Sequence, residues 1–313
     1  MKTYGLPYKG SKDKIADKIC SLFPIKENFY DLFMGGGSIT HYQLLQNQYK
    51  NYYANDFNPL VVKAFDMAIH GKFKNETRWI SHEEFDKLKD IDPYVAFCFS
   101  FGNDLKSYAY SKEVEPYKKA IHYYIVMNDD SLLKKLYPNI KFPICKNKDF
   151  LKRRLFLQRF MKHNISLFEG VLKNHIEKMV ISSNLNRIEN LERFEKIENF
   201  NFNFNNLYLF SKSYDEIEIK PNSVIYCDIP YKSTNKYEIS KDFDYEKFYS
   251  WCERQTELCF ISEYSMPKNR FTCIAEIEHR SLICANDNQS VIEKVFLPNH
   301  QAKDYKIPSL FDL

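Results

Sequence analysis

The sequence lacks the patterns that mark metal-binding, membrane-spanning and secreted proteins. Its eight cysteines form no Cys-x-x-Cys pair and no Cys/His cluster at zinc spacing, so reduced, buried thiols and no metal are expected. No apolar run reaches about 18 residues, and the N-terminus has no apolar signal core, which predicts a soluble, cytoplasmic protein without membrane contact. A serine nucleophile elbow and clustered histidines are also missing, which argues against hydrolysis.

The chain has little excess charge, because 45 basic and 41 acidic residues leave a net charge of only +4. Any nucleic-acid surface must therefore come from segregation of charge along the sequence. Residues 146–162 are such a segment, with seven basic residues and a single acid, Asp149. Phosphate contacts and a solvated helix face both remain open for this run. Its place between two halves of a predicted sheet favours DNA, with Lys152, Arg153 and Arg154 as candidate contacts.

Glycine is scarce too, and three of the eight glycines are consecutive, at positions 35–37. Residues 28–33 are expected to form a strand that runs into these glycines, and a helix follows them. A second strand over residues 52–55 ends at Asp56, ahead of another helix from residues 58–59. This β-loop-α-β-loop-α pattern predicts the start of a doubly wound sheet.

The glycine loop and the acid after the second strand point to a ligand. The loop at Gly35 and Gly37 fits neither the G-x-G-x-x-G pattern nor a P-loop. A nicotinamide dinucleotide, a phosphate, S-adenosylmethionine (SAM) or only a tight turn remain open for it. Asp56 is placed to accept hydrogen bonds from ribose hydroxyls or to cap the next helix. The two features together favour a cofactor that carries a nucleoside.

The remaining pattern divides the chain into two parts. A helix is predicted over residues 12–23, and helical patterns dominate from about residue 80 to about residue 198. A helix over residues 245–256 accompanies five further strands, predicted at residues 204–210, 223–227, 258–262, 271–283 and 291–297. The simplest account is one α/β sheet domain, residues 1–90 and 200–313, whose halves flank a helical insertion at residues 91–199.

One strand end carries the most specific motif. An apolar run over residues 223–227 stops at Asp228, and Ile229, Pro230 and Tyr231 follow. A buried strand that ends in this way places the acid at the edge where open α/β sheets bind ligands. A hydrogen-bond acceptor, a rigid turn and a flat ring suit a planar heterocycle that is held by its amino group.

These segments together resemble the Dam-like, D12-class (alpha-type) adenine-specific DNA N6-methyltransferases, including their phage-type members. The residues from Asp228 to Tyr231 resemble the family's Asp-Pro-Pro-Tyr signature, with Ile229 in place of the first proline. Residues 30–38 resemble its Phe-x-Gly-x-Gly motif, and residues 54–58 its ribose-binding motif. Further resemblances occur, in the family's order, at residues 6–12, 100–108, 210–214, 261–264 and 293–298.

The resemblance implies a Rossmann-like, SAM-dependent methyltransferase sheet with an inserted helical target-recognition domain. It implies direct in-line transfer to adenine N6 in double-stranded DNA after base flipping, without a metal. The implied catalytic residues are Asp228, Ile229, Pro230 and Tyr231. The implied SAM-binding residues are Tyr8, Lys12, Phe33, Gly35, Gly37, Asp56 and Asp228. Candidate DNA contacts in the insertion, besides the basic run, are Asn103, Lys106 and Tyr108.

Ile229 is the departure from the family pattern. The residue still offers its backbone carbonyl as an acceptor, and Pro230 restricts it to extended geometry. N4-cytosine methylation and a SAM- and DNA-binding protein with weakened catalysis remain the alternatives. An NAD-type oxidoreductase leaves the motif at Asp228 and the basic run unexplained. C5-cytosine methylation is excluded, because none of the 12 prolines precedes a cysteine. The recognition sequence and a partner restriction endonuclease stay open.

Overall fold

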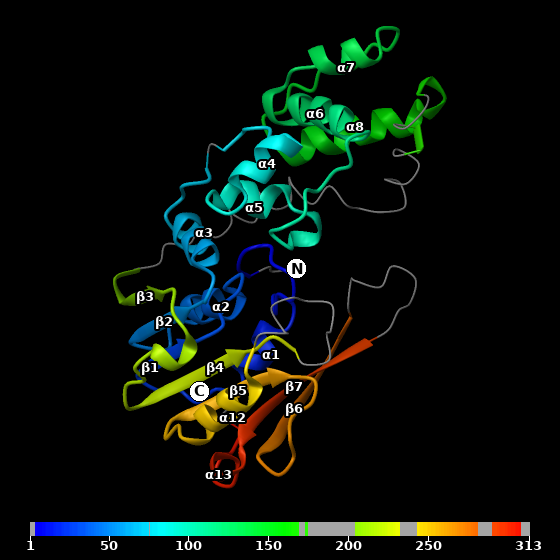
Figure 1. Ribbon diagram of the computed structural model, residues 1–313. Helices are drawn as coiled ribbons and strands as arrows, with labels where there is room; N and C mark the ends of the chain where they lie inside the picture. Colours follow the sequence, from blue (N-terminus) through cyan, green and yellow to red (C-terminus); the bar gives the residue numbers. More distant parts are fainter. Residues whose placement is uncertain are drawn as a thin grey trace. The chain divides into compact units, whose positions relative to one another are not determined.

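The structure is a computed structural model that describes residues 4–74, 76–168, 173–174, 204–231, 243–280 and 290–307. It divides into two compact units (Figure 1). The sheet unit comprises residues 1–6, 10–66 and 199–313, and the helical unit comprises residues 7–9 and 67–198. The helical unit therefore begins near residue 67, earlier than the boundary expected from the sequence. In the described part of the chain, no helix combines the length and apolar character needed to cross a membrane.

The sheet unit contains a seven-stranded sheet in the order β3-β2-β1-β4-β5-β7-β6. The strands are β1 (Asn28–Asp31), β2 (Asn51–Asn55), β3 (Leu207–Phe210), β4 (Ser223–Asp228), β5 (Leu258–Glu263), β6 (Phe271–Arg280) and β7 (Ser290–Pro298). The first five strands along the chain pair in parallel, whereas β7 runs antiparallel to both β5 and β6. The predicted α/β, Rossmann-like sheet is confirmed. The part of the predicted strand at residues 281–283 lies outside the described residues.

The strand order creates a switch point between β1 and β4. From β1 the chain proceeds outward to β2 and β3, and then returns to place β4 on the other side of β1. Asp31 at the end of β1 pairs in register with Tyr226, two residues before the end of β4. The loops that leave these two strands therefore start side by side, which is where open parallel sheets bind ligands.

Helices cover the sheet, and their apolar sides build its core. The sheet unit holds α1 (Ala16–Cys20), α2 (Ser38–Gln46), α12 (Tyr245–Glu253) and α13 (Asn299–Ala302), and α3 (Pro59–Ile69) crosses the boundary between the units. One core cluster packs Phe248 and Trp251 of α12 against Ile225, Cys227 and other strand residues. Such burial of apolar surface is the main stabilising contribution to the fold.

The first predicted helix is shorter than the sequence indicated. Its apolar side chains, among them Ile15, Ile19 and Phe23, are buried as expected. The helix itself covers only α1, however, because residue 12 is irregular and residues 13–15 form turns. The prediction of a helix over residues 12–23 is therefore wrong in extent, although the amphipathic pattern marks the correct buried side.

The helical unit has its own core. Its described α-helices are α4 (His82–Leu88), α5 (Pro93–Phe99), α6 (Glu115–His122), α7 (Ser131–Leu136) and α8 (Phe150–His163), with a π-helical turn at Tyr123–Met127 after α6. Leu133 of α7, and Leu157 and Met161 of α8, meet Ile121 and Tyr124 in one apolar cluster. The predicted helical stretch at residues 175–198 lies outside the described residues.

Candidate active site

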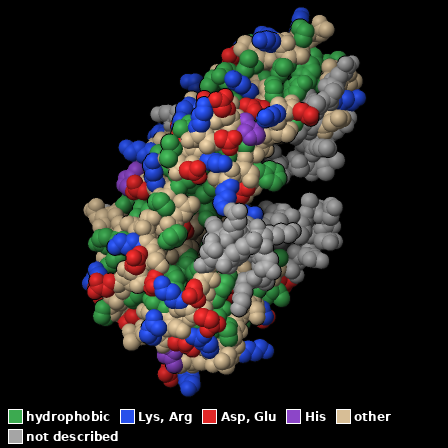
Figure 2. All heavy atoms as spheres, viewed as in Figure 1, with side chains coloured by type: hydrophobic (Ala, Val, Ile, Leu, Met, Phe, Trp, Pro, Cys, Tyr) green, Lys and Arg blue, Asp and Glu red, His purple; other side chains and the backbone are tan. Residues whose placement is uncertain are grey.

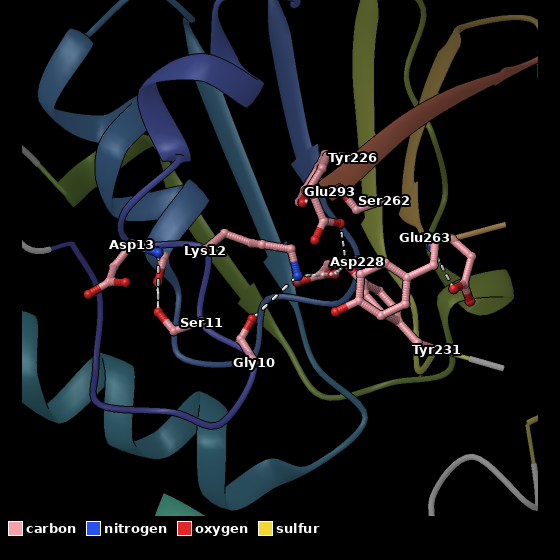
Figure 3. Close-up of polar contacts among 12 residues, drawn as sticks. Gly10, Ser11, Lys12, Asp13, Tyr226, Asp228, Tyr231, Ser262, Glu263 and Glu293 are labelled. Atoms are coloured by element: carbon pink, nitrogen blue, oxygen red, sulfur yellow. Dashed lines mark hydrogen bonds and ion pairs between the residues drawn. The ribbon is translucent and has the colours of Figure 1, made fainter. Parts of the chain in front are cut away.

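Asp228 at the end of β4 forms an ion pair with Lys12, a residue far away in the sequence (Figure 3). The Nζ atom of Lys12 lies 2.8 Å from both carboxylate oxygens of Asp228 and 3.3 Å from the carbonyl oxygen of Gly10. Lys12 is buried. Burial lowers the pKa of Lys12, but the charges of Asp228 and Glu293 outweigh it and raise that pKa above its ordinary value. Lys12 is therefore a charged ammonium that fixes the Asp228 carboxylate.

Tyr231 points inward, toward the same ion pair. Its hydroxyl donates a hydrogen bond to Glu293 and lies 3.2 Å from Oδ1 of Asp228. The Lys12 ammonium lies 4.9 Å from the centre of the Tyr231 ring, and the ring of Tyr264 meets it edge to face at 4.6 Å. Burial raises the pKa of Tyr231, so its hydroxyl stays protonated and acts as a donor. Stacking of this ring on a flipped base stays a prediction.

The two residues between Asp228 and Tyr231 are held by the core. The Ile229 side chain is buried in the cluster that contains Ile225 and Cys227. The carbonyl oxygen of Pro230 accepts a hydrogen bond of 2.8 Å from the hydroxyl of Tyr245. Burial of the Ile229 side chain stabilises the fold, which explains why an isoleucine is tolerated at the position of the usual proline.

The glycine loop after β1 is braced by Asp56. The N–H of Gly35 donates to Oδ2 of Asp56 at 2.8 Å, and the N–H of Asn58 donates to Oδ1 at 2.8 Å. Burial raises the pKa of Asp56, and these two hydrogen bonds oppose that rise. The contact with Asn58 braces the turn before α3, whereas Asn58 itself caps that helix by accepting from the N–H of Leu60 at 3.0 Å. Hydrogen bonding to a ribose stays a prediction.

Two other residues of this loop have clear structural requirements. Gly37 has a φ of 71°, and a Cβ atom there would lie 2.4 Å from the Phe65 ring, so only glycine fits. Phe33 stacks on Tyr214 at 5.4 Å, which stiffens the start of the loop. Tyr8, the remaining residue proposed for SAM binding, belongs to the helical unit, where its ring lies 6.2 Å from that of Phe97.

The structure also shows three buried acids without a predicted role, Asp31, Glu263 and Glu293. Each is at most 2% exposed. Asp31 ends β1 and accepts a hydrogen bond of 2.7 Å from Thr40 through Oδ2, while its Oδ1 has no hydrogen-bond partner among the described residues. Glu293 lies on the same side of β7 as the buried Val295 and Leu297. An acid at a position of the strand that is expected to be apolar was the sequence signal that could have identified it.

Asp31 makes stability depend on pH. Burial is the main cause that raises the pKa of Asp31 from 3.8 to about 7. The folded protein therefore binds more protons than the unfolded chain between about pH 4 and pH 7, and stability falls as pH rises through this window. We expect Asp31→Asn, which keeps an oxygen for Thr40, to gain up to about 4 kcal/mol relative to wild type between pH 4 and pH 8. Urea unfolding without cofactor, at several pH values, measures this. An equal stability difference at every pH would contradict it.

In the helical unit, a tight hairpin carries the proposed contacts Asn103, Lys106 and Tyr108. Ser100 pairs with Tyr108 in an antiparallel bridge, and Asn103 has a φ of 58°, in the left-handed region. The Tyr108 hydroxyl donates to the carbonyl oxygen of Ile80 at 2.7 Å, so this side chain anchors the hairpin. Lys106 is exposed. Base or phosphate contacts by these residues stay predictions.

The basic run over residues 146–162 separates into a buried and an exposed part. Arg153 and Arg154 are 6% and 8% exposed, and the Arg153 guanidinium donates to the carbonyl oxygen of Lys148 at 2.9 Å. Burial lowers the pKa of Arg153. Both arginines are thus largely buried in the helical unit, and their contact with DNA phosphates stays a prediction. The exposed cations of the run are Lys146, Lys148, Lys152, Arg159 and Lys162. On the face seen in Figure 2, basic and acidic side chains are intermixed.

The strand order, the glycine loop after β1 and the acid at the end of β4 define a Rossmann-like methyltransferase fold. The chain belongs to the D12 class N6 adenine-specific DNA methyltransferases, whose family model matches residues 8–265. It is therefore an enzyme of a family that methylates adenine in DNA. No curated protein matches the chain. The resemblance drawn from the sequence is confirmed at the level of this class.

Proposed function

We propose that the chain transfers a methyl group from SAM directly to N6 of an adenine that has been flipped out of double-stranded DNA. The observation that carries the proposal is Asp228, which the sheet places at the switch point with Lys12 fixing its carboxylate. The family supports adenine as the target base. The likeness of residues 6–12 and 100–108 supports a Dam-like, phage-type subtype. Nucleoside analysis of duplex DNA incubated with SAM and the purified chain tests this function, with N6-methyladenine as the expected product.

The acids at the switch point fit SAM, which carries hydroxyl and ammonium groups. Oδ1 of Asp31 is a buried acceptor with no partner among the described residues. Each oxygen of Asp56 accepts one backbone N–H and retains a lone pair for a ribose hydroxyl. SAM, when bound, supplies a methyl group on a positively charged sulfur. The sheet-unit residues that would hold it are Lys12, Phe33, Gly35, Gly37, Asp56 and Asp228.

Asp228 and the carbonyl of Ile229 are the proposed acceptors for the two hydrogens of the target amino group. That nitrogen is a poor nucleophile while its lone pair is delocalised into the ring, and two acceptors favour a pyramidal nitrogen. Lys12 already contacts both Asp228 oxygens, so the amino group would use a remaining lone pair. In this account the rate comes from positioning and fixed charges.

Flipping the base costs a few kcal/mol, which the pocket must offset. In our proposal the Tyr231 ring stacks on the flipped base, a contact of a kind that contributes roughly 1–3 kcal/mol. The exposed cations of α8 would hold the DNA backbone, since phosphate contacts dominate affinity for duplex DNA.

Asp56 provides a test of cofactor binding. We expect Asp56→Ala to weaken SAM binding by about tenfold or more, because hydrogen bonds to a charged group contribute about 1.5–3 kcal/mol. Isothermal calorimetry with SAM and no DNA measures the affinity. Asp149→Ala is the matched control, since it removes a helix-capping carboxylate from α8 in the helical unit. Equal SAM affinity in the Asp56→Ala variant and wild type would leave Asp56 with only its structural role of bracing the glycine loop.

A further inference from the structure

Glu293 is a buried acid that touches the proposed catalytic motif from another strand. It lies on β7, is 2% exposed, and falls beyond residues 8–265 that match the family model. Its carboxylate accepts hydrogen bonds from the hydroxyl of Tyr231 and from Ser262 on β5. The charges of Lys12 and Asp228 also act on it. Figure 3 shows Glu293 close to Asp228 and Tyr231, at the site described above.

A carboxylate in this position has a cost for the fold. Burial raises the pKa of Glu293, while Lys12 and the hydrogen bonds from Tyr231 and Ser262 oppose the rise. Ser262 is in turn held by the Tyr226 hydroxyl at 2.9 Å, which completes a chain of polar contacts inside the sheet. An apolar residue in line with Val295 and Leu297 would avoid this cost, because buried polar groups destabilise unless they are hydrogen-bonded. The presence of Glu293 is thus better explained by its hydrogen bond with Tyr231 than by a contribution to the stability of the fold.

We propose that Glu293 is a positioning residue for methyl transfer, which acts by holding the hydroxyl of Tyr231. The inference rests on the proposed function. The backbone fixes one end of Tyr231 immediately after β4, and Glu293 fixes the other end through the hydroxyl. Oδ1 of Asp228 lies 3.2 Å from the same hydroxyl, Tyr264 lies at the edge of the ring, and the Lys12 ammonium lies over its face. Two fixed ends set the angle of the ring beside Asp228, and therefore the place of a base stacked on it.

The test is a double-mutant cycle on the single-turnover rate at saturating SAM and DNA. We expect Glu293→Ala and Tyr231→Phe each to slow methylation about tenfold, because small misplacements of reacting groups lower rates steeply. The double variant should be no slower than Tyr231→Phe alone, because both changes remove the hydrogen bond to Glu293, and Tyr231→Phe also removes the 3.2 Å contact with Asp228. Glu293→Gln retains an oxygen acceptor for the hydroxyl and should stay within about threefold of wild type. If Glu293 only stabilised the fold, Glu293→Gln would not restore the rate, and the effects of Glu293→Ala and Tyr231→Phe on the rate would multiply.

Glu276→Ala is the matched control, because Glu276 is an exposed acid on the neighbouring strand β6 and pairs with Lys294. It should leave the rate unchanged, and all variants should bind SAM within about twofold of wild type. A double variant that is about a hundredfold slower would overturn the inference. If Glu293→Ala does not fold, Tyr231→Phe decides alone, and a wild-type rate in that variant overturns the inference. Failure of the wild type to methylate adenine would instead overturn the proposed function.

Discussion

Asp228→Ala should abolish methyl transfer, with a loss of about a thousandfold or more in the single-turnover rate at saturating SAM. Asp228 is the acceptor at the end of β4, and the strand aims it at the switch point between β1 and β4. Its removal takes away the acceptor for the target amino group and leaves the Lys12 ammonium without its 2.8 Å partner. The rate of methyl incorporation into duplex DNA measures this effect.

Because Lys12 is buried, loss of its partner also weakens the fold, and a second variant separates the two effects. Asp228→Asn keeps the shape of the side chain but removes the charge, and it should still lose most of the rate. Asp17→Ala, which removes an exposed acid from α1, should keep the wild-type rate. Near wild-type methylation by a folded Asp228→Ala variant would show that the mechanism proposed for this site is wrong.

Neutralising Lys152, Arg159 and Lys162 together should produce the second large effect, on DNA binding. These three exposed cations lie on one side of α8, whereas Leu157 and Met161 face the core of the helical unit. Replacement of all three by glutamine should weaken DNA binding and reduce the slope of log affinity against log salt. The expected reduction is roughly 0.9 for each lost phosphate contact on duplex DNA.

The measurement is DNA affinity at several salt concentrations. The control is a variant with Lys87, Lys134 and Lys135 changed to glutamine, which loses the same charge from α4 and α7 of the same unit. It should change the slope less than the α8 variant does. If the α8 variant keeps the wild-type slope, its cations form only a solvated face.

Most of the sheet was predictable, because its strands have strong local signals. β4 and β5 consist mainly of apolar residues and each ends at an acid, and their bounds match the expected segments within a residue. The glycine run and Asp56 marked the first two strand ends for the same reason, since turns need particular residues. The pairing of β7 between β5 and β6 depends on contacts between distant segments, which local patterns do not contain.

The site was only partly predictable. Asp228 and Tyr231 stand in one short motif, whereas the ion pair of Asp228 joins residues 216 positions apart. Lys12, which makes this contact, lies in the irregular segment before α1, where a helix was predicted. Glu293 was not assigned a role for a similar reason, since its partner Tyr231 follows β4, a different strand of the sheet.

The arginines of α8 illustrate how a helix divides a basic run between a buried and an exposed side. A count of basic residues over 146–162 treats the run as one surface, although a helix has a buried side. Leu157 and Met161 mark that side, and Arg153 and Arg154 lie on it, where Arg153 donates to backbone carbonyls. Helical spacing applied to the charges, as it was to the apolar residues, would have separated the exposed cations from the buried ones.

The most direct test of the account is nucleoside analysis of duplex DNA after incubation with SAM and either wild-type chain or the Asp228→Ala variant. DNA from a metal-free reaction is digested to nucleosides, and the methylated species are separated by chromatography. The account predicts N6-methyladenine with wild type and none with the variant. N4-methylcytosine, no methylated nucleoside with wild type, or equal N6-methyladenine with both proteins would contradict it.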